Sequence, residues 1–305
     1  MQSTNGARSG AASADDDMLG WEAIMARPAK VDWILPDVLP ANSRAMAYGD
    51  SGVGKSQTFT SIACHVATGK PWRGKPVKQG TVYYIAVENP EAFPATAQAW
   101  DKMYKGAAYW EKHHKREGET VPPLHLIDKI DLSSPDSVSE LLKRLGPAVL
   151  VIIDTLQVAM GDFDILRPND NYRTIRQINR IRERTGATVL VVHHSQEGGI
   201  KPLGGTGVRG GYQVRMRLER YRGKAKLGEQ ADFQDGDRVT LTCEKMTRGR
   251  KFDQVSLPVQ MVHVMRDVDV PMIAPAERSP AGLSQSAAAI RKRRSRMKVT
   301  ENDAA

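Results

Sequence analysis

The sequence predicts an α/β fold: a mainly parallel, twisted sheet flanked by helices, with antiparallel strands added at the C-terminal end. Two observations predict it. From residue 44 onward, short and nearly continuous apolar runs alternate with longer amphipathic stretches, as a parallel sheet that is covered on both faces requires. After about residue 212 the helical pattern stops, and polar and apolar residues alternate as they do in antiparallel strands.

The individual elements follow from the apolar spacing. Five apolar runs are the expected parallel strands: 45–48, 81–87, 124–127, 149–153 and 188–192. The expected helices between them span 56–67, 94–104, 135–145 and 171–184, and the expected antiparallel strands span 212–221, 238–244 and 252–261. In the last helix Tyr172, Ile175, Ile178 and Ile181 recur every three residues on one face. Asn169 or Asp170 is expected to cap its start, and Gly186 its end.

The two ends of the chain differ in composition from its centre. Residues 1–20 are rich in Ser, Gly, Ala and Asp and are expected to be a disordered arm. Residues 21–39 contain two tryptophans and several aliphatic residues, so we expect an ordered lead-in that packs on the core or on a neighbouring subunit. Residues 271–305 are expected to be a linker and a basic tail. One folded domain is thus predicted at 21–270.

The segment from Gly49 to Ser56 matches the complete phosphate-binding P-loop pattern, between an expected strand and an expected helix. Its glycines let successive backbone N–H groups point at phosphate oxygens, and the helix N-terminus adds its positive end. Lys55 is expected to reach the β- and γ-phosphates, and the Ser56 hydroxyl to hold Mg²⁺. The expected nucleotide-binding residues are Gly49, Asp50, Ser51, Gly52, Val53, Gly54, Lys55, Ser56 and Gln57. The sequence therefore predicts a site for a nucleoside triphosphate, with ATP the expected nucleotide.

Polar residues at the ends of three other expected strands could serve this nucleotide. Asp154 ends an apolar strand, as in the Walker B pattern, and is expected to act on the Mg²⁺; it could instead cap the next turn. Glu88 ends the strand that we expect beside the P-loop, where it could accept a proton from attacking water or act as a helix N-cap. His194 could hydrogen-bond the γ-phosphate. A zinc site at this histidine is disfavoured, because no third ligand follows at a useful spacing.

Composition argues against a disulfide-rich protein and against a membrane protein. Two distant cysteines, Cys64 and Cys243, form neither a CxxC pair nor a disulfide framework. No run of 18 apolar residues and no apolar signal core is present, so we expect a soluble, cytoplasmic protein with no membrane partner.

The formal net charge of +9 is concentrated near the end of the chain, where residues 291–298 hold six basic residues and no acidic one. Such a block favours nucleic acid as a partner, although a merely solubilising tail is the alternative. Residues 282–297 are expected to form one helix with Ser284 as its N-cap.

Several stretches together give the chain a resemblance to the RecA-like hexameric helicases, and most closely to the RepA-type plasmid and phage replicative ATPases. The resemblance covers roughly residues 31–257. The stretches that carry it are Val31–Leu35, Ala67–Gly74, Val82–Glu88, Leu150–Thr155 and Arg184–His194, together with the P-loop. It implies a RecA-like P-loop NTPase core.

The resemblance also implies roles for individual residues. It makes Glu88 the catalytic base and His194 the sensor of the γ-phosphate. In such rings ATP lies between subunits, and a neighbour supplies a cationic finger. Lys245 and Arg248 are the expected fingers, with Arg250 in reserve; exposed turn charges between two strands are the alternative.

The family's DNA-contacting loops correspond to residues 157–171 and 195–211 here. They contain Arg167 in the first loop, and Lys201 and Arg209 in the second. Gly-rich loops with single cations suit a single strand that is gripped by its phosphates and released in each cycle. An ordinary flexible loop is the alternative.

These expectations lead to one main hypothesis: an ATP-dependent DNA helicase or translocase of plasmid or phage replication that forms a ring, expected to be a hexamer. A separate primase or initiator protein is a possible partner. One alternative is a RecA-like recombination or DNA-remodelling ATPase that unwinds nothing. Another is a DNA-binding replication adaptor switched by ATP.

Overall fold

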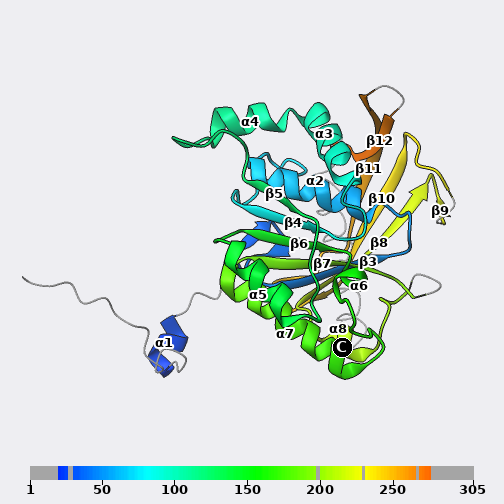
Figure 1. The fold of residues 1–305 in the computed structure, drawn as a ribbon. Coiled ribbons are helices and arrows are strands. Elements are labelled where there is room, and N and C mark those ends of the chain that lie inside the picture. The colour runs from blue at the N-terminus through cyan, green and yellow to red at the C-terminus, as the bar shows by residue number, and fades with distance from the viewer. Residues whose placement is uncertain (1–19, 27–29, 197–199, 229–230, 266–267, 276–305) are drawn as a thin grey trace, which may run out of the picture. The chain divides into compact units, whose positions relative to one another are not determined.

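The computed structural model describes residues 20–26, 30–196, 200–228, 231–265 and 268–275 (Figure 1). Residues 1–19 of the expected arm and the expected helix at 282–297, with Ser284, lie outside this range. Helix α1 (Trp21–Ala26) belongs to a compact unit that ends at Asp32, and a second unit begins at Trp33. Within the described residues, no helix combines the length and apolar character that crossing a bilayer requires.

The second unit is organised by one large sheet. The strand order along it is β12 (Val268–Ile273), β11 (Gln254–Met265), β10 (Asp237–Met246), β8 (Val214–Arg222), β3 (Arg44–Gly49), β7 (Thr188–His194), β6 (Leu150–Asp154), β4 (Val82–Ala86) and β5 (Leu124–Ile127). The short strand β9 (Ala225–Leu227) pairs with β8. Strands β1 (Trp33–Leu35) and β2 (Leu39–Pro40) form a separate antiparallel pair.

The sheet has a parallel half and an antiparallel half that meet at β8. Strands β8, β3, β7, β6, β4 and β5 pair in parallel with their neighbours in that order. Strands β8, β10, β11 and β12 pair antiparallel. This arrangement confirms the predicted fold class. The last strand reaches Ile273 and so crosses the boundary predicted at residue 270.

Helices cover both faces of the parallel half. Helices α2 (Lys55–Thr68), α3 (Ala92–Tyr104) and α4 (Gly106–His113) lie on one side in Figure 1. Helices α5 (Pro135–Arg144), α7 (Pro168–Thr185) and α8 (Thr206–Gly210) lie on the other, and α6 (Leu156–Ala159) follows β6.

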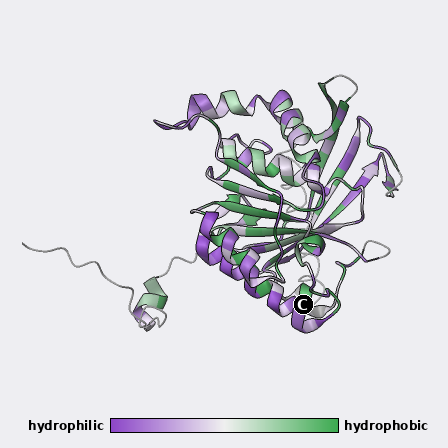
Figure 2. Cartoon of the chain, viewed as in Figure 1, coloured by the Kyte–Doolittle hydropathy of each residue, from purple (hydrophilic) through white to green (hydrophobic). Residues whose placement is uncertain are grey.

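Each face of the sheet has its own hydrophobic core. On β6, Ile152 packs into the core that contains Phe59 of α2, whereas Val151 packs into the core that contains Ile178 of α7. Adjacent residues of a strand point to opposite faces, so a strand with a core on each side must be apolar throughout. Figure 2 shows the hydrophobic strands of this half and the largely hydrophilic helices α5 and α7.

Helix α7 differs from its prediction at its start and on one face. It begins at Pro168, with Arg167 and not Asn169 or Asp170 at the N-cap position, because the fixed φ of proline suits the first helical turn. Gly186 ends it in the left-handed conformation, as predicted. Tyr172 is 73% exposed whereas Ile178 and Ile181 are buried, so its predicted place on one face with them was wrong. Residues three apart drift about 60° around a helix, so four such residues cannot all face the core.

The lead-in segment is only partly as expected. Ile34, Leu35, Val38 and Leu39 are buried and join the core on the α2 face of the sheet.

Helix α4 was not predicted. Its Trp110 is 2% exposed, and this buried ring holds against the protein a helix whose remaining residues are mostly exposed.

Candidate functional site

The strand register brings the predicted site residues to one edge of the sheet. His194 ends β7 and lies opposite Gly49 of β3, where the P-loop begins. Asp154 ends β6, opposite Val192 on one side and Ala86 of β4 on the other. Glu88 lies two residues beyond the end of β4. Because all these strands are parallel, their carboxyl ends open onto the same crevice.

The predicted position of Glu88 is wrong in one respect. Its strand is not beside the P-loop strand, because β7 and β6 lie between β3 and β4. Glu88 nevertheless lies near the ends of β6 and β7, since its backbone amide donates to the Asp154 carbonyl and its side chain contacts His194. A parallel sheet allows this crossover, and sequence order alone does not give spatial order.

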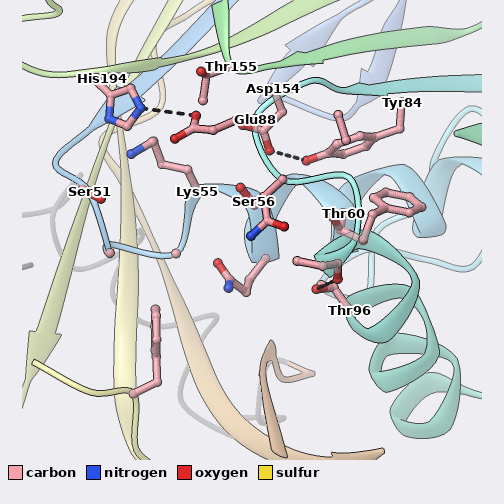
Figure 3. A pocket seen from close by; sticks show the side chains of 18 residues that line it. Ser51, Lys55, Ser56, Thr60, Tyr84, Glu88, Thr96, Asp154, Thr155 and His194 are labelled. Carbon is pink, nitrogen blue, oxygen red and sulfur yellow. Dashed lines mark hydrogen bonds and ion pairs between the residues drawn. The ribbon is translucent and has the colours of Figure 1, made fainter. Parts of the chain in front are cut away.

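A cavity of about 250 Å³ occupies this crevice (Figure 3). Its predicted lining residues are Ser51, Gly52, Gly54, Lys55, Ser56, Gln57, Glu88, Asp154 and His194. The others are Thr60, Tyr84, Ala86, Asn89, Ala92, Phe93, Thr96, Thr155 and Phe233. Gly49, Asp50 and Val53 were predicted to bind the nucleotide but are not part of the wall formed by the described residues. The Val53 side chain is buried in the core instead.

Glycine is required in the P-loop for two different structural reasons. Gly52 and Gly54 have φ angles of 70° and 90°, which side-chain-bearing residues rarely adopt. Gly49 was expected to provide the same bend, but it is the last residue of β3. There, a Cβ atom would lie 2.6 Å from the carbonyl oxygen of Leu218 on β8. Gly49 therefore permits close approach of two strands, while Gly52 and Gly54 form the bend.

Lys55 starts helix α2 and is 7% exposed. Its Nζ donates to the carbonyl oxygens of Gly49 at 3.0 Å and Asp50 at 2.8 Å. In Figure 3 the side chain extends toward Glu88 and His194. The amine is thus held over the loop at the helix N-terminus, where an anion is favoured.

Asp154 is 6% exposed and accepts a hydrogen bond from the Tyr84 hydroxyl at 2.7 Å. Burial raises the pKa of Asp154, while hydrogen bonds from Tyr84 and Ser56 and the charge of Lys55 oppose this rise. Burial and the neighbouring Asp154 carboxyl raise the pKa of Tyr84, so its hydroxyl stays a donor. The Ser56 hydroxyl and the Asp154 carboxylate are hard oxygen ligands, and this donor set fits Mg²⁺.

Glu88 and His194 form a pair above this cluster. The Glu88 Oε2 and His194 Nε2 atoms are 3.5 Å apart, with side chains 45% and 26% exposed. The capping alternatives for the two acids are not supported. The N-cap of α3 is Glu91 and that of α6 is Thr155, so neither Glu88 nor Asp154 holds a capping position.

The predicted finger residues lie away from this protomer's own cavity. Lys245 is in β10, and its Nζ donates to the Gly210 carbonyl at 3.4 Å. Arg248 and Arg250 are exposed in the turn between β10 and β11. Among the described residues that line the cavity, none of these three occurs.

The predicted DNA-binding segments are more regular than the loops we expected. The first contains α6 and the first turn of α7, and its Met160 and Ile165 are buried, with Arg167 exposed. In the second segment, Ser195 pairs with Pro202 in a β-bridge and α8 follows.

The predicted cations of the second segment are separated. Lys201 is exposed beside this bridge. Arg209 belongs to α8, and its side chain lies outside the described part of the structure. Gly204 was expected to supply freedom, but it packs closely against Val208 and Ile165.

Sequence reasoning missed Tyr84, Phe93 and Phe233 as lining residues. A signal for Tyr84 was available, because alternation along the strand places residues 84, 86 and 88 on the same side. Phe93 lies on α3, the helix that follows Glu88. Phe233 comes from the connection after β9, and no local pattern marks it.

The comparisons agree with this geometry. The family model for the AAA domain matches residues 12–199, a span that includes the P-loop, Glu88, Asp154 and His194. No curated protein matches the chain. The matched span covers more than half of the 305 residues. The chain therefore belongs to the AAA domain family and is a P-loop ATPase with a RecA-like fold.

Proposed function

We propose that the chain is an ATP-driven DNA helicase or translocase of plasmid or phage replication, which hydrolyses ATP at the subunit interfaces of a ring, expected to be a hexamer. One observation carries the ATPase part of this proposal. Lys55, Ser56, Asp154, Glu88 and His194 come from the ends of four strands and line one cavity.

Different residues of the cavity are proposed to bind the phosphates and the Mg²⁺ ion. The P-loop amides and the Lys55 amine bind the β- and γ-phosphates. Ser56 and Asp154 would hold Mg²⁺, with Tyr84 fixing the Asp154 carboxylate in place. When bound, Mg²⁺ neutralises charge on the phosphate oxygens.

Glu88 is the proposed general base. It takes a proton from the water whose oxygen attacks the γ-phosphorus, while the bond from that phosphorus to the bridging oxygen of ADP breaks. His194 hydrogen-bonds the γ-phosphate, and its 3.5 Å contact with Glu88 ties the base to the presence of that phosphate. This water-activating arrangement favours turnover over a purely ATP-switched adaptor.

The cavity lacks part of the positive charge that the reaction needs. Among its described lining residues, Lys55 is the only lysine or arginine. Phosphoryl transfer develops charge that a further cation commonly stabilises. Lys245 and Arg248 lie near the exposed β10–β11 turn, away from their own cavity, so we propose that they act on a neighbouring subunit's ATP, with Arg250 in reserve.

A direct link between the P-loop and the second expected DNA segment supports a motor. The Ser195 hydroxyl donates to the Asp50 carboxylate, and the Ser195 amide donates to the Gly49 carbonyl at 3.2 Å. The buried Tyr48 hydroxyl lies 2.6 Å from the Glu244 carboxylate and 2.9 Å from the Ile200 carbonyl, two acceptors that share its single proton. A change at the P-loop can therefore move Lys201, which with Arg167 and Arg209 is proposed to hold single-stranded DNA.

An unwinding assay on a forked duplex, read beside electron micrographs of the same sample, tests this proposal. Rings that unwind the fork with ATP, and do not when Glu88→Gln replaces the wild type, support it. Filaments or rings that hydrolyse ATP without unwinding indicate the recombination or remodelling alternative. DNA binding that is unchanged in Glu88→Gln, with no DNA-stimulated turnover in wild type, indicates the adaptor.

A further inference from the structure

The connection between β9 and β10 brings an aromatic side chain to the nucleotide cavity. Phe233 lines the cavity although its strands belong to the antiparallel half of the sheet. It lies beside the last P-loop glycine, where a Cβ added to Gly54 would come within 3.1 Å of the ring's Cζ atom. The ring is only partly buried, and it packs against the core that includes Val239.

A buried arginine supports this ring from behind. The Arg220 guanidinium carbon lies 4.0 Å from the centre of the Phe233 ring, and the Arg220 side chain is fully buried. Its Nη2 donates to the carbonyls of Gly228 and Ala231, while Nε and Nη1 have no hydrogen-bond partner among the described residues. Such a guanidinium stacks favourably on an aromatic face, more so where water is excluded.

A second arginine fixes the residues on either side of Phe233. Arg222 donates to the Asp232 carbonyl at 2.9 Å and to the buried Asp237 carboxylate at 2.7 Å. Asp237 in turn accepts a hydrogen bond from the Gln234 amide at 3.2 Å. The backbone before and after Phe233 is therefore anchored to β8 and β10. An anchored ring needs little further ordering when it binds a ligand.

The other two aromatic side chains of the cavity wall are buried and already packed or hydrogen-bonded within the protein. Tyr84 is 1% exposed, and its hydroxyl is committed to Asp154. Phe93 is 9% exposed and packs on Tyr84 with their ring centres 4.6 Å apart. Among the described lining residues, Phe233 is thus the aromatic one that keeps open ring surface.

We propose that Phe233 is the platform on which the purine base of the nucleotide stacks. The inference rests on the proposed function, because the triphosphate must first be held by the P-loop. Every base offers a flat π-face, and a purine offers more stacking area than a pyrimidine. Phe233 then favours purine over pyrimidine nucleotides, and Arg220 and Arg222 are positioning residues that hold it.

The test compares nucleotides with a base-free probe, ribose 5′-triphosphate, on the full chain. We expect Phe233→Leu to weaken ATP binding about tenfold or more, by the usual contribution of base–aromatic stacking. Binding of ribose 5′-triphosphate should change less than twofold, which also shows that the variant's P-loop is intact. Phe233→Trp should bind ATP at least as tightly as wild type, and the preference of wild type for ATP over CTP should shrink in Phe233→Leu.

Phe93→Leu is the matched control, and it should affect ATP and ribose 5′-triphosphate equally. The proposal is overturned if Phe233→Leu binds ATP like wild type, if it loses both probes equally, or if Phe93→Leu alone loses ATP selectively. A wild-type chain that binds neither probe would contradict the proposed function itself. This outcome is distinct from a failure confined to the base.

Discussion

The parallel and antiparallel halves of the sheet contribute to the nucleotide site in different ways. The parallel half supplies Asp154 and His194 at the carboxyl ends of strands, Glu88 just beyond such an end, and Lys55 after the P-loop that follows β3. Among the described lining residues, the antiparallel half supplies one to its own cavity, Phe233, from a loop anchored by the buried Arg220 and the half-exposed Arg222.

The parallel half therefore carries the groups for ATP hydrolysis, and the antiparallel half carries the groups proposed for base recognition and for contact with a neighbouring subunit. Strand ends in a parallel sheet meet by topology alone, so a catalytic cluster there needs no special loop. Residues of the antiparallel half depend on particular side-chain contacts, or on a neighbouring subunit, to reach a site. We therefore expect changes in the parallel half to act within one subunit, and changes in the β10–β11 turn to act across subunits.

Arg248→Ala is the strongest test of this division. If Arg248 stabilises the transition state on a neighbour, its loss should lower ATP turnover by about 10³-fold, the usual effect of an arginine finger. In mixtures with wild type, activity should fall by more than the variant's fraction. Arg238→Ala, which removes an exposed arginine from strand β10, is the control. A loss of ATP turnover strictly proportional to the Arg248→Ala fraction would contradict the assignment of Arg248 to a neighbour's site.

The parallel half should also be the half that is sensitive to mild acid. Burial lowers the pKa values of His65 on α2 and His193 on β7 to about 4. The unfolded chain therefore binds more protons than the folded one between about pH 6.5 and 4, and stability falls as pH drops through this window. Each histidine contributes a loss of about 3 kcal/mol by pH 4.

The antiparallel half lacks this behaviour at its buried Asp237. Burial opposes ionisation there, but hydrogen bonds from Arg222 and Gln234 outweigh it and lower the pKa of Asp237. Its stabilising contribution is thus kept above about pH 4 and lost only below that.

Urea unfolding at pH 7 and pH 4.5 should show a smaller loss of stability in His193→Gln than in wild type. Equal losses in the two proteins would rule out His193 as a cause.

Tyr84→Phe removes the hydrogen bond to Asp154 while keeping the ring. An outer partner of a metal ligand typically contributes 10- to 100-fold in metal affinity, so the Mg²⁺ concentration needed for half-maximal turnover should rise by about this factor. Tyr83→Phe is a matched control, because the neighbouring hydroxyl accepts from the Gly146 amide outside the cavity. The same rise in both variants would show a general effect on the strand.

Ser195→Ala removes the side-chain link between the second expected DNA segment and the P-loop. One lost hydrogen bond contributes about 1 kcal/mol, so we expect the ratio of DNA-stimulated to basal ATP turnover to fall about fivefold. Ser139→Ala, which removes a partly exposed hydroxyl on α5 away from the cavity, should leave the ratio unchanged. If Ser195→Ala keeps the wild-type ratio, the link plays no part in coupling.

The sequence predicted the parallel half far better than the antiparallel one. Asp154 and His194 follow apolar runs directly, and a parallel sheet brings such ends together whatever the loops do. The spatial order of the strands was not available, so Glu88 was placed one strand from the P-loop strand when two others lie between.

Phe233 could not be predicted because its position depends on tertiary contacts with Arg220 and Arg222 on β8. As a charged residue on an alternating strand, Arg220 reads as solvent-facing in the sequence, yet it is fully buried. The predicted DNA segments were expected to be loops because of the family resemblance, while buried residues such as Ile165 and Val208 hold them against the core.

Side-by-side measurement of ATP turnover and ATP affinity in Glu88→Gln tests the central claim most directly. The account predicts that wild-type turnover rises with single-stranded DNA. It also predicts that Glu88→Gln loses about 10²-fold or more of its turnover while binding ATP about as tightly as wild type, because only proton transfer is removed. Wild-type turnover in Glu88→Gln, or a loss of ATP affinity as large as in Lys55→Ala, would contradict it.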